Sequence, residues 1–315
     1  MADKAQTLLN SAEVWPSLPL EEWRETCETL HLWTQVVGKV RLALAPLINH
    51  WWEAALYVTA RGLTTSPIPY QSHYFQIDFD FISHELRIDR DDGRRHILPL
   101  KPQTVAAFYR DVMDALHSLE IEVKLWPVPV EVPDPIPFEQ DETHRTYDPE
   151  QAQRFWRVLV QTDRVFTEFR ARFVGKVSPV HFFWGSFDLV VTRFSGRAAP
   201  KHSSVPGLAD HVLQEAYSHE CSSAGFWPGG GGVDFPAFYS YAYPEPPGYD
   251  GFRILPPEAS YDPQLHEFLL PYEAVRLAPA PDEMLLAFLQ STYEAAADLG
   301  RWDRPALERQ PPVAG

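Results

Sequence analysis

The chain has 315 residues, 45% of them apolar and 22% charged, which are proportions of a globular protein rather than a disordered one. Its 27 Lys and Arg residues against 43 Asp and Glu residues give a net charge of −16. A surface of this sign repels polyanions at long range, which argues against nucleic acid and anionic membrane surfaces as partners. The 10 Trp and 30 Pro residues favour stacked sheets with stiff connections over a helical bundle.

Cysteine content and the N-terminal segment bear on the compartment. Two cysteines, Cys27 and Cys221, are too few for a disulfide framework, and no CxxC motif is present. The first twenty residues lack the basic start and apolar run of a signal peptide, and no window is apolar for long enough to cross a bilayer. We therefore expect a cytoplasmic protein of bacterial type without a membrane partner.

The first half of the chain predicts a helix, then antiparallel strands, then a second helix. An amphipathic helix is expected over 20–37, and its acidic first turn suits the N-terminus of a helix. Apolar and polar residues alternate over 75–81, the period of a strand with one buried face. A hairpin is expected at Asp92-Gly93, where Gly supplies the positive φ of a tight turn, and a closing helix over 104–119.

The second half predicts a similar series of elements. A connector over 126–149 precedes it, in which recurring prolines deny a central strand and favour an extended segment. A helix follows over 149–173, with apolar residues at helical spacing. Tyrosines alternate along a strand over 239–243, and a last helix is expected over 282–299.

Three short motifs occur twice, in the same order. They are VGKV at 37–40 and 174–177, HWW at 50–52 with HFFW at 181–184, and LYVT at 56–59 with LVVT at 189–192. We therefore predict an α+β fold in which a unit of antiparallel sheet flanked by helices is internally duplicated about a pseudo-two-fold axis. The predicted organisation is a first copy over 1–125, the connector over 126–149 and a second copy over 150–315. Chance similarity of short apolar runs is the alternative.

Features found in one copy only are the better functional candidates, and most lie in the second copy. Asp188 stands in an apolar run that should be buried, where the first copy has Ala55. A buried carboxylate is costly unless it is paired, and Arg193 or a histidine is the expected partner. A salt bridge that fixes strand register and a role in a site remain equal alternatives for Asp188.

The segment 217–221 is the densest cluster of reactive side chains. If the protein is an enzyme, we expect His219 to be the general acid or base, and Glu220 or Asp188 to supply the orienting or second carboxylate. In a strand, however, His219 and Cys221 would share one face and Glu220 would point to the other. An ordinary structural histidine is the alternative.

Histidines at matched places in the two copies raise the question of a metal. His181 together with His219 and a carboxylate would form a two-histidine, one-carboxylate set for a divalent ion, although no HxH or HExxH spacing supports it. His50 occupies the corresponding place in the first copy, and recurrence in both copies favours a structural role instead.

A ligand pocket in the second copy is the remaining expectation. Arg193 would bind a charged group of the ligand, and Trp184, Trp227 and Tyr241 would form apolar walls. Glycines 229–232 permit a mobile lid, but they are equally an ordinary surface loop.

Several stretches of the sequence resemble the signature stretches of an uncharacterised bacterial family. They are TTSPIPY (64–70), WPVPVEVPDPIPF (126–138), SPVHFFWGSFDL (178–189), TRFSGR (192–197), YSHE (217–220), GFWPGG (225–230) and YPEPPG (243–248). The resemblance spans nearly the whole chain and implies a bacterial cytoplasmic protein of about this size. It implies no activity, cofactor or catalytic residue.

The function expected from the sequence is therefore the binding of a small molecule in a pocket of the C-terminal half, with acid–base or metal-assisted catalysis left open. The alternative is a non-catalytic interaction or scaffold protein whose acidic surface and proline segments contact a partner. The oligomeric state is open.

Overall fold

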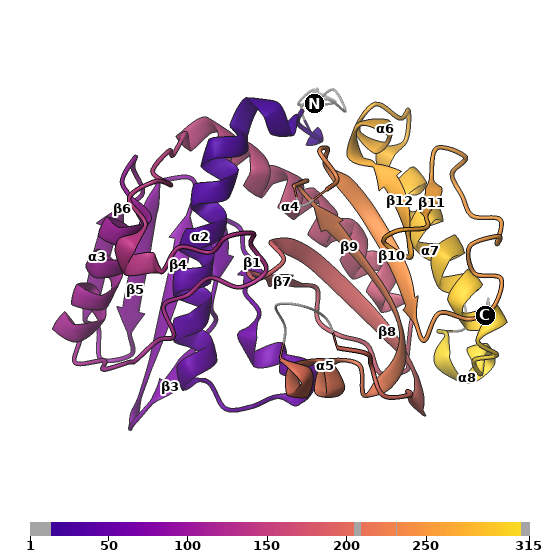
Figure 1. Cartoon of the computed structure of the whole chain (residues 1–315), viewed down its shortest axis with the longest axis horizontal. Coiled ribbons are helices and arrows are strands. Elements are labelled where there is room, and N and C mark those ends of the chain that lie inside the picture. Colours follow the sequence, from indigo (N-terminus) through magenta and orange to yellow (C-terminus); the bar gives the residue numbers. More distant parts are fainter. Residues whose placement is uncertain (1–13, 205–208, 231, 310–315) are drawn as a thin grey trace, which may run out of the picture.

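The computed structural model describes residues 14–204, 209–230 and 232–309. The protein has two antiparallel sheets of six strands each, with helices packed against them (Figure 1). The predicted α+β class is confirmed. A chain long enough to form two sheets with covering helices can bury a core that is stable without disulfides.

The first sheet has the order β1-β2-β4-β5-β6, with β3 paired to the other part of β4. Its elements are α2 (Leu20–Leu44), η1 (Asn49–Ala54), β1 (Tyr57–Val58), β2 (Gly62–Thr64), β3 (Ile68–Tyr70), β4 (His73–Asp80), β5 (Glu85–Arg90), β6 (Arg95–Pro99) and α3 (Val105–Ser118). The hairpin predicted at Asp92-Gly93 joins β5 to β6, and Gly93 has the expected positive φ of 88°. Thr104 caps α3 by accepting a hydrogen bond from the amide of Ala107.

The second sheet has the order β11-β12-β10-β9-β8-β7. Its elements, after η2 (Phe138–Gln140) in the connector, are α4 (Pro149–Ala171), β7 (His181–Phe183), β8 (Asp188–Ala198), α5 (Asp210–Ala216), β9 (His219–Trp227), β10 (Ala237–Tyr243), β11 (Ser260–Asp262), β12 (Glu267–Pro271), α6 (Tyr272–Arg276), α7 (Pro281–Leu299) and α8 (Arg304–Leu307). Asp148 caps α4, whose first residue is the proline at which the predicted helix begins.

Each half contains, in the same order, a long helix, a short edge strand, further antiparallel strands and a closing helix, and the second half has α5, α6 and α8 in addition. Their edge strands meet at Leu56 and Phe182, which exchange both backbone hydrogen bonds at 2.8 and 2.7 Å. An antiparallel bridge of this kind is what a two-fold relation between the halves would produce. The shared order supports an internal duplication, which stays an inference.

The repeated motifs, however, do not occupy equivalent places. The first VGKV lies inside α2, which continues to Leu44, whereas the second follows the end of α4. His50 lies in the 3-10 helix η1, whereas His181 begins strand β7. The predicted matching of these two histidines is therefore wrong. The strand register also excludes the predicted match between Ala55 and Asp188. In the first half Thr64 pairs with Tyr57, and in the second half Asp188 pairs with Phe183, so the counterpart of Asp188 is Thr64.

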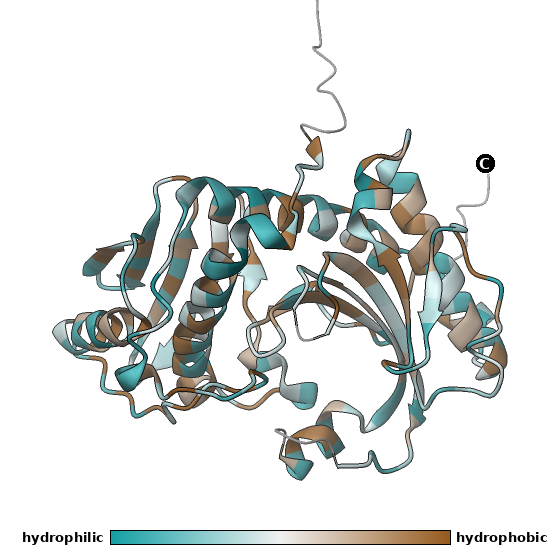
Figure 2. Cartoon of the chain, turned by 45° about the horizontal axis from the view of Figure 1, so that its top comes forward, coloured by the Kyte–Doolittle hydropathy of each residue, from teal (hydrophilic) through white to brown (hydrophobic). Residues whose placement is uncertain are grey.

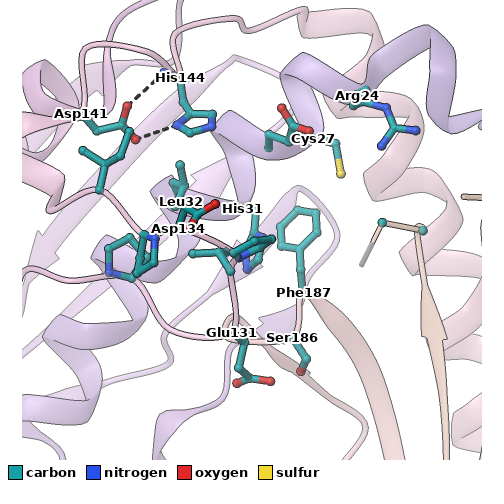
Figure 3. Close-up of a pocket in the computed structure, with 18 of the residues that line it drawn as sticks. Arg24, Cys27, His31, Leu32, Glu131, Asp134, Asp141, His144, Ser186 and Phe187 are labelled. Atoms are coloured by element: carbon teal, nitrogen blue, oxygen red, sulfur yellow. Dashed lines mark hydrogen bonds and ion pairs between the residues drawn. The ribbon is translucent and has the colours of Figure 1, made fainter. Parts of the chain in front are cut away.

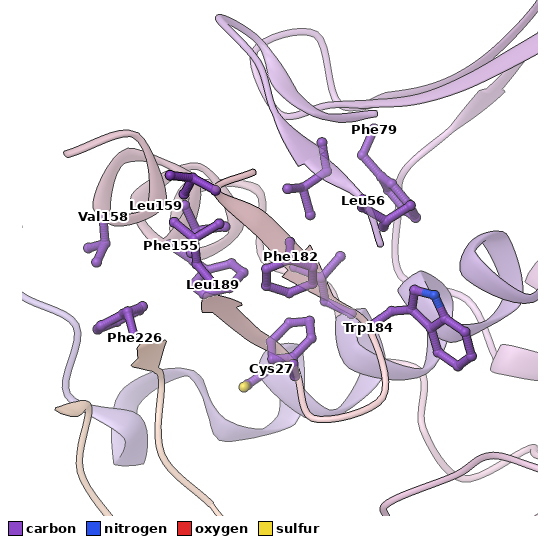
Figure 4. Packing of buried hydrophobic residues seen from close by; sticks show 14 of the residues in the cluster. Cys27, Leu56, Phe79, Phe155, Val158, Leu159, Phe182, Trp184, Leu189 and Phe226 are labelled. Atoms are coloured by element: carbon purple, nitrogen blue, oxygen red, sulfur yellow. The ribbon is translucent and has the colours of Figure 1, made fainter. Parts of the chain in front are cut away.

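One hydrophobic core runs through both halves. Trp23 of α2 packs on Phe155 of α4 with ring centroids 5.0 Å apart, and Phe155 stacks on Phe187 at 5.1 Å. Figure 4 shows this junction, where residues from the first half such as Leu56 lie beside Phe182 of the second. In Figure 2, brown and teal residues alternate along the long helices, as expected of helices with one buried face.

The connector over 126–149 packs against α2. Lys39 donates to the carbonyl oxygens of Val128 and Trp126 at 2.6 and 3.2 Å, and the side-chain amide of Gln35 exchanges two hydrogen bonds of 2.9 Å with the backbone of Val130. From residue 126 to residue 148 the connector forms no strand and a single helical turn, η2, and it bends over 130–134. In the described part of the chain, no helix is long and apolar enough to span a membrane.

Candidate functional site

The second sheet separates two environments. Because side chains alternate along β8, Leu189, Val191 and Arg193 face α4 and the core, while Asp188 and Val190 face the other way. On that second side lies a cavity of about 490 Å³, here called the second-sheet cavity. Its volume is in the range of small-molecule sites.

Four parts of the chain enclose the second-sheet cavity. Strands β7 to β10 form its floor, and η1, α5 and connector residues Val130 and Glu131 close it. Eight aromatic side chains line it: Trp51, Trp52, Phe183, Trp184, Phe194, Tyr217, Tyr239 and Tyr241. The indole of Trp184 is fixed by a 2.6 Å hydrogen bond to the carbonyl oxygen of Ala54, so this wall is rigid.

Asp188 lies at one end of the cavity and is only 6% exposed. Ser186 donates a hydrogen bond of 2.5 Å to its Oδ1, and the hydroxyl of Tyr239 donates to its Oδ2. Burial raises the pKa of Asp188 to about 6, against the opposing effect of these two donors. Among the described residues, no lysine, arginine or histidine forms an ion pair with it.

Glu131 is the second carboxyl at this end. The connector brings it there with a left-handed φ of 56°, beside the anchored Val130. A Cβ at position 185 would lie 2.3 Å from its Oε1, so Gly185 leaves room for this carboxylate where it now lies. Desolvation and then the charge of Asp188 raise the pKa of Glu131 to about 7.

Glu267 of β12 adds a third carboxyl on the same side of the sheet. It lies beside Tyr241 on the neighbouring strand β10. Desolvation, then Asp188 and Asp262, raise its pKa to about 7. The raised pKa values of Glu131 and Glu267 therefore share one cause besides burial, the negative charge of Asp188.

The opposite end of the cavity is built around η1. His50 and Trp51 have φ values of 62° and 61°, a costly conformation for residues other than glycine that is often kept at functional sites. Nδ1 of His50 donates to the carbonyl oxygen of Ala216, so its Nε2 accepts from the Lys176 ammonium at 2.6 Å. Burial and the nearby Lys176 charge lower the pKa of His50, which keeps the ring neutral.

A smaller cavity of about 370 Å³ adjoins the first, since Glu131 and Ser186 line both. Figure 3 shows this cavity, with His144 at its top hydrogen-bonded through Nδ1 to Asp141 at 2.7 Å. Asp141 also accepts two loop amides, and Cys27 is buried with its pKa raised by desolvation. Asp141 therefore stabilises its own loop, and the buried Cys27 is an unreactive thiol.

Four of the residues expected from the sequence line the second-sheet cavity together: Asp188, Trp184, Tyr241 and His181. The others are placed elsewhere. His219 pairs with Ala198 at the far end of β8, ten residues from Asp188 and so roughly 30 Å away at the rise of a strand. It lies beside His50 at a centroid distance of 5.8 Å.

Glu220 points to the other face of the sheet, as predicted for a strand. It accepts hydrogen bonds from Arg197 at 2.5 Å and Ser195 at 2.9 Å, so its carboxylate is engaged in a surface ion pair. The predicted set of His219, Glu220 and Asp188 therefore does not converge on one point.

Arg193 is 1% exposed and packs in the core rather than in the cavity. Its guanidinium lies 3.4 Å from the ring centroid of Phe169 and 4.4 Å from that of Tyr293, and it donates to the carbonyl oxygen of Phe169. The expected pairing with Asp188 does not occur, because residues 188 and 193 lie on opposite faces of one strand. Trp227 lines the smaller cavity.

The expected metal set is not assembled. Within residues 14–204, 209–230 and 232–309, no group of three or more His, Cys, Asp or Glu side chains could hold a metal ion. His181 is buried among the rings of Phe183, Trp52 and Tyr57, and burial lowers its pKa to about 3. Of the glycine segment 229–232, Gly231 lies outside the described residues, and Gly229 and Gly230 line the smaller cavity.

Sequence reasoning missed Glu131 and Ser186, which line the cavity, and Glu267, which does not line it but lies close enough to Asp188 for that charge to raise its pKa. Ser186 stands two residues before Asp188, which was a usable signal for a hydrogen bond between neighbouring side chains. Glu131 lies in an irregular connector that no periodicity describes, and only tertiary packing on α2 places it.

Comparison with known proteins identifies the family of the chain but assigns it no activity. Neither curated proteins nor solved structures gave a significant match. A family model described as a family of unknown function, DUF5996, matches residues 15–309. This agrees with the resemblance carried by the sequence stretches, and the chain belongs to the DUF5996 family of unknown function.

Proposed function

We propose that this protein binds a small molecule in the second-sheet cavity, with Asp188 as the polar anchor. The observation that supports the proposal most is a buried carboxylate without a cationic partner at the end of an aromatic cavity of about 490 Å³. Apolar walls with a few convergent polar groups are typical of ligand sites, and an unpaired buried charge is costly in a protein without such a role.

Acid–base catalysis is the second candidate, and a specific observation favours it. The pKa values of Asp188 and Glu131 are raised to about 6 and about 7, close to the pH at which a carboxyl can both give and take a proton. In this reading the two carboxyls replace His219 and Glu220 as the reactive groups. We also propose a cytoplasmic, bacterial setting, on the resemblance and composition described above.

A ligand screen with two matched variants tests the binding proposal. We expect compounds from a metabolite library that raise the melting temperature of the wild-type chain to lose that effect in Asp188→Asn. Asp163→Asn is the control, because Asp163 of α4 also has a pKa raised to about 6 by burial but lines no part of the cavity.

Val190→Phe provides an independent variant, since Val190 faces the cavity and the larger ring projects into it without removing a polar group. We expect it to block the same compounds. Compounds that bind Asp188→Asn and Val190→Phe as well as they bind the wild type would show that the binding site lies elsewhere.

A further inference from the structure

We propose that the ligand of the second-sheet cavity is a small organic cation, an amine on an apolar or aromatic body, held between Asp188, Glu131 and the aromatic walls. This inference rests on the proposed binding function and deepens it by naming the chemical class. Three independent features of the described residues support it.

The first feature is a surplus of negative charge without compensation. Asp188, Glu131 and Glu267 lie near enough to one another for the charge of Asp188 to act on both glutamates. None of the three forms an ion pair with a described side chain. Of the three, Asp188 is the buried one, at 6% exposed, whereas Glu131 is exposed and Glu267 is half-buried. A buried carboxylate without a cationic partner is costly, so a cation from solution would stabilise Asp188.

The second feature is the aromatic lining, which already accommodates a cation. The Lys176 ammonium lies 5.6 Å from the ring centroid of Trp52 and 5.0 Å from that of Phe194, and both rings line the cavity. Aromatic faces attract ammonium groups, most strongly where water is excluded. Near Asp188 the rings of Tyr239 and Tyr241 stack with centroids 6.2 Å apart, and no described cation is recorded over them.

The third feature is an unsatisfied polar group on the wall. His181 is 1% exposed, lines the cavity, and has an Nδ1 without a hydrogen-bond partner in the described part of the chain. It stands on β7 opposite Val190, next to the pair formed by Phe183 and Asp188. Buried polar atoms are rarely left unpaired, so this Nδ1 is a hydrogen-bonding group on the wall that the fold itself leaves unsatisfied.

An organic cation fits this site better than a metal ion. The residues described contain no group of three or more metal-ligating side chains, and the cavity is far larger than an ion requires. Ser186 and the hydroxyl of Tyr239 already donate to Asp188, which leaves its carboxylate suited to one or two further donors such as those of an ammonium group.

The test uses three probes that share one ring system and differ in charge: tryptamine, tryptophol and indole-3-acetate. Tyramine with its alcohol and carboxylate analogues forms a second series. By isothermal titration of the full chain, we expect an amine to bind at least about tenfold more tightly than its alcohol, and the carboxylate to bind more weakly still. Asp188→Asn should abolish the preference for the amine, and Asp163→Asn should retain it.

Glu131→Gln is the second variant, because Glu131 lies in the exposed connector and its replacement disturbs no core packing. We expect it to reduce the amine preference severalfold. Equal binding of amine and alcohol, tighter binding of the carboxylate, or no binding of either amine would overturn the inference. The binding function itself would survive those results if the library screen gave a neutral or anionic ligand that Val190→Phe excludes.

Discussion

Asp188 shows how a single residue can lower the stability of the fold in which it lies. Its pKa is higher in the folded chain than the ordinary value of 3.8, so the folded state holds the proton more tightly than the unfolded state does. The contribution of this group to stability is therefore complete below that ordinary pKa and is lost as the pH rises through about 6.

We expect Asp188→Asn to be more stable than the wild type above about pH 7, by about 1–2 kcal/mol, because the unpaired charge is gone. The decline of the wild-type free energy of unfolding between about pH 4 and pH 7 should be smaller in the variant. Urea denaturation at several pH values measures both. Lower stability of the variant at every pH would contradict this account of the residue.

Arg193, unlike Asp188, stabilises the fold, because its guanidinium packs on aromatic rings in the core. We expect Arg193→Met to destabilise the protein by about 2–4 kcal/mol through loss of the guanidinium packing on Phe169 and Tyr293. Arg197→Met, which removes a surface ion pair with Glu220, should cost less than about 1 kcal/mol. Chemical denaturation of the two variants gives the comparison, and equal losses would exclude the packing role.

At the scale of elements, the contact between α2 and the turn after β7 depends on one glycine. A Cβ at Gly38 would lie 2.1 Å from Cδ1 of Trp184, so the indole occupies the space that a side chain on the helix would take. The VGKV motif of the first half therefore has a packing reason that its repeat does not share, because Gly175 lies after α4 and near Leu307 instead.

Gly38→Ala tests this contact by the sign of its effect. Helix propensity alone predicts a gain of about 1 kcal/mol, whereas displacement of Trp184 predicts a net loss of about 1–3 kcal/mol. We expect the loss, together with altered tryptophan fluorescence. Gly251→Ala is the control, because its added methyl group would meet only one backbone oxygen, at 3.9 Å. A stabilised Gly38→Ala protein would refute the close contact.

At the scale of the whole molecule, the halves share one core and each covers part of the other. Phe155 of α4 packs between Trp23 and Phe187, and the second-sheet cavity is closed by η1 from the first half and by the connector. The site is therefore a property of the complete chain, although most of its ionisable groups come from the second half.

We expect fragments 14–125 and 150–309 to lack a cooperative unfolding transition when produced separately, because each would expose its side of the shared core. The full chain should unfold in a single transition. Circular dichroism during thermal unfolding distinguishes these outcomes. A fragment that melts cooperatively by itself would show that the halves are independent domains.

The sequence by itself determined the elements, because local chemistry fixes them: the proline and Asp148 start α4, Gly93 closes a hairpin, and alternation marks β4 and β10. It also determined, through the parity of a strand, that Asp188 and Arg193 face apart, although the sequence analysis did not use that rule. Periodicity says which side of a strand a residue takes, but not what lies opposite it.

Only the tertiary structure decided which groups meet. Asp188 and His219 begin the neighbouring antiparallel strands β8 and β9 and so stand at opposite ends of this pair, whereas Glu131 reaches Asp188 from an irregular connector held by Gln35 of a distant helix. Contacts of this kind depend on how separate elements pack, and no local pattern encodes that packing. The physical reason is that burial and charge act through space, while sequence patterns act along the chain.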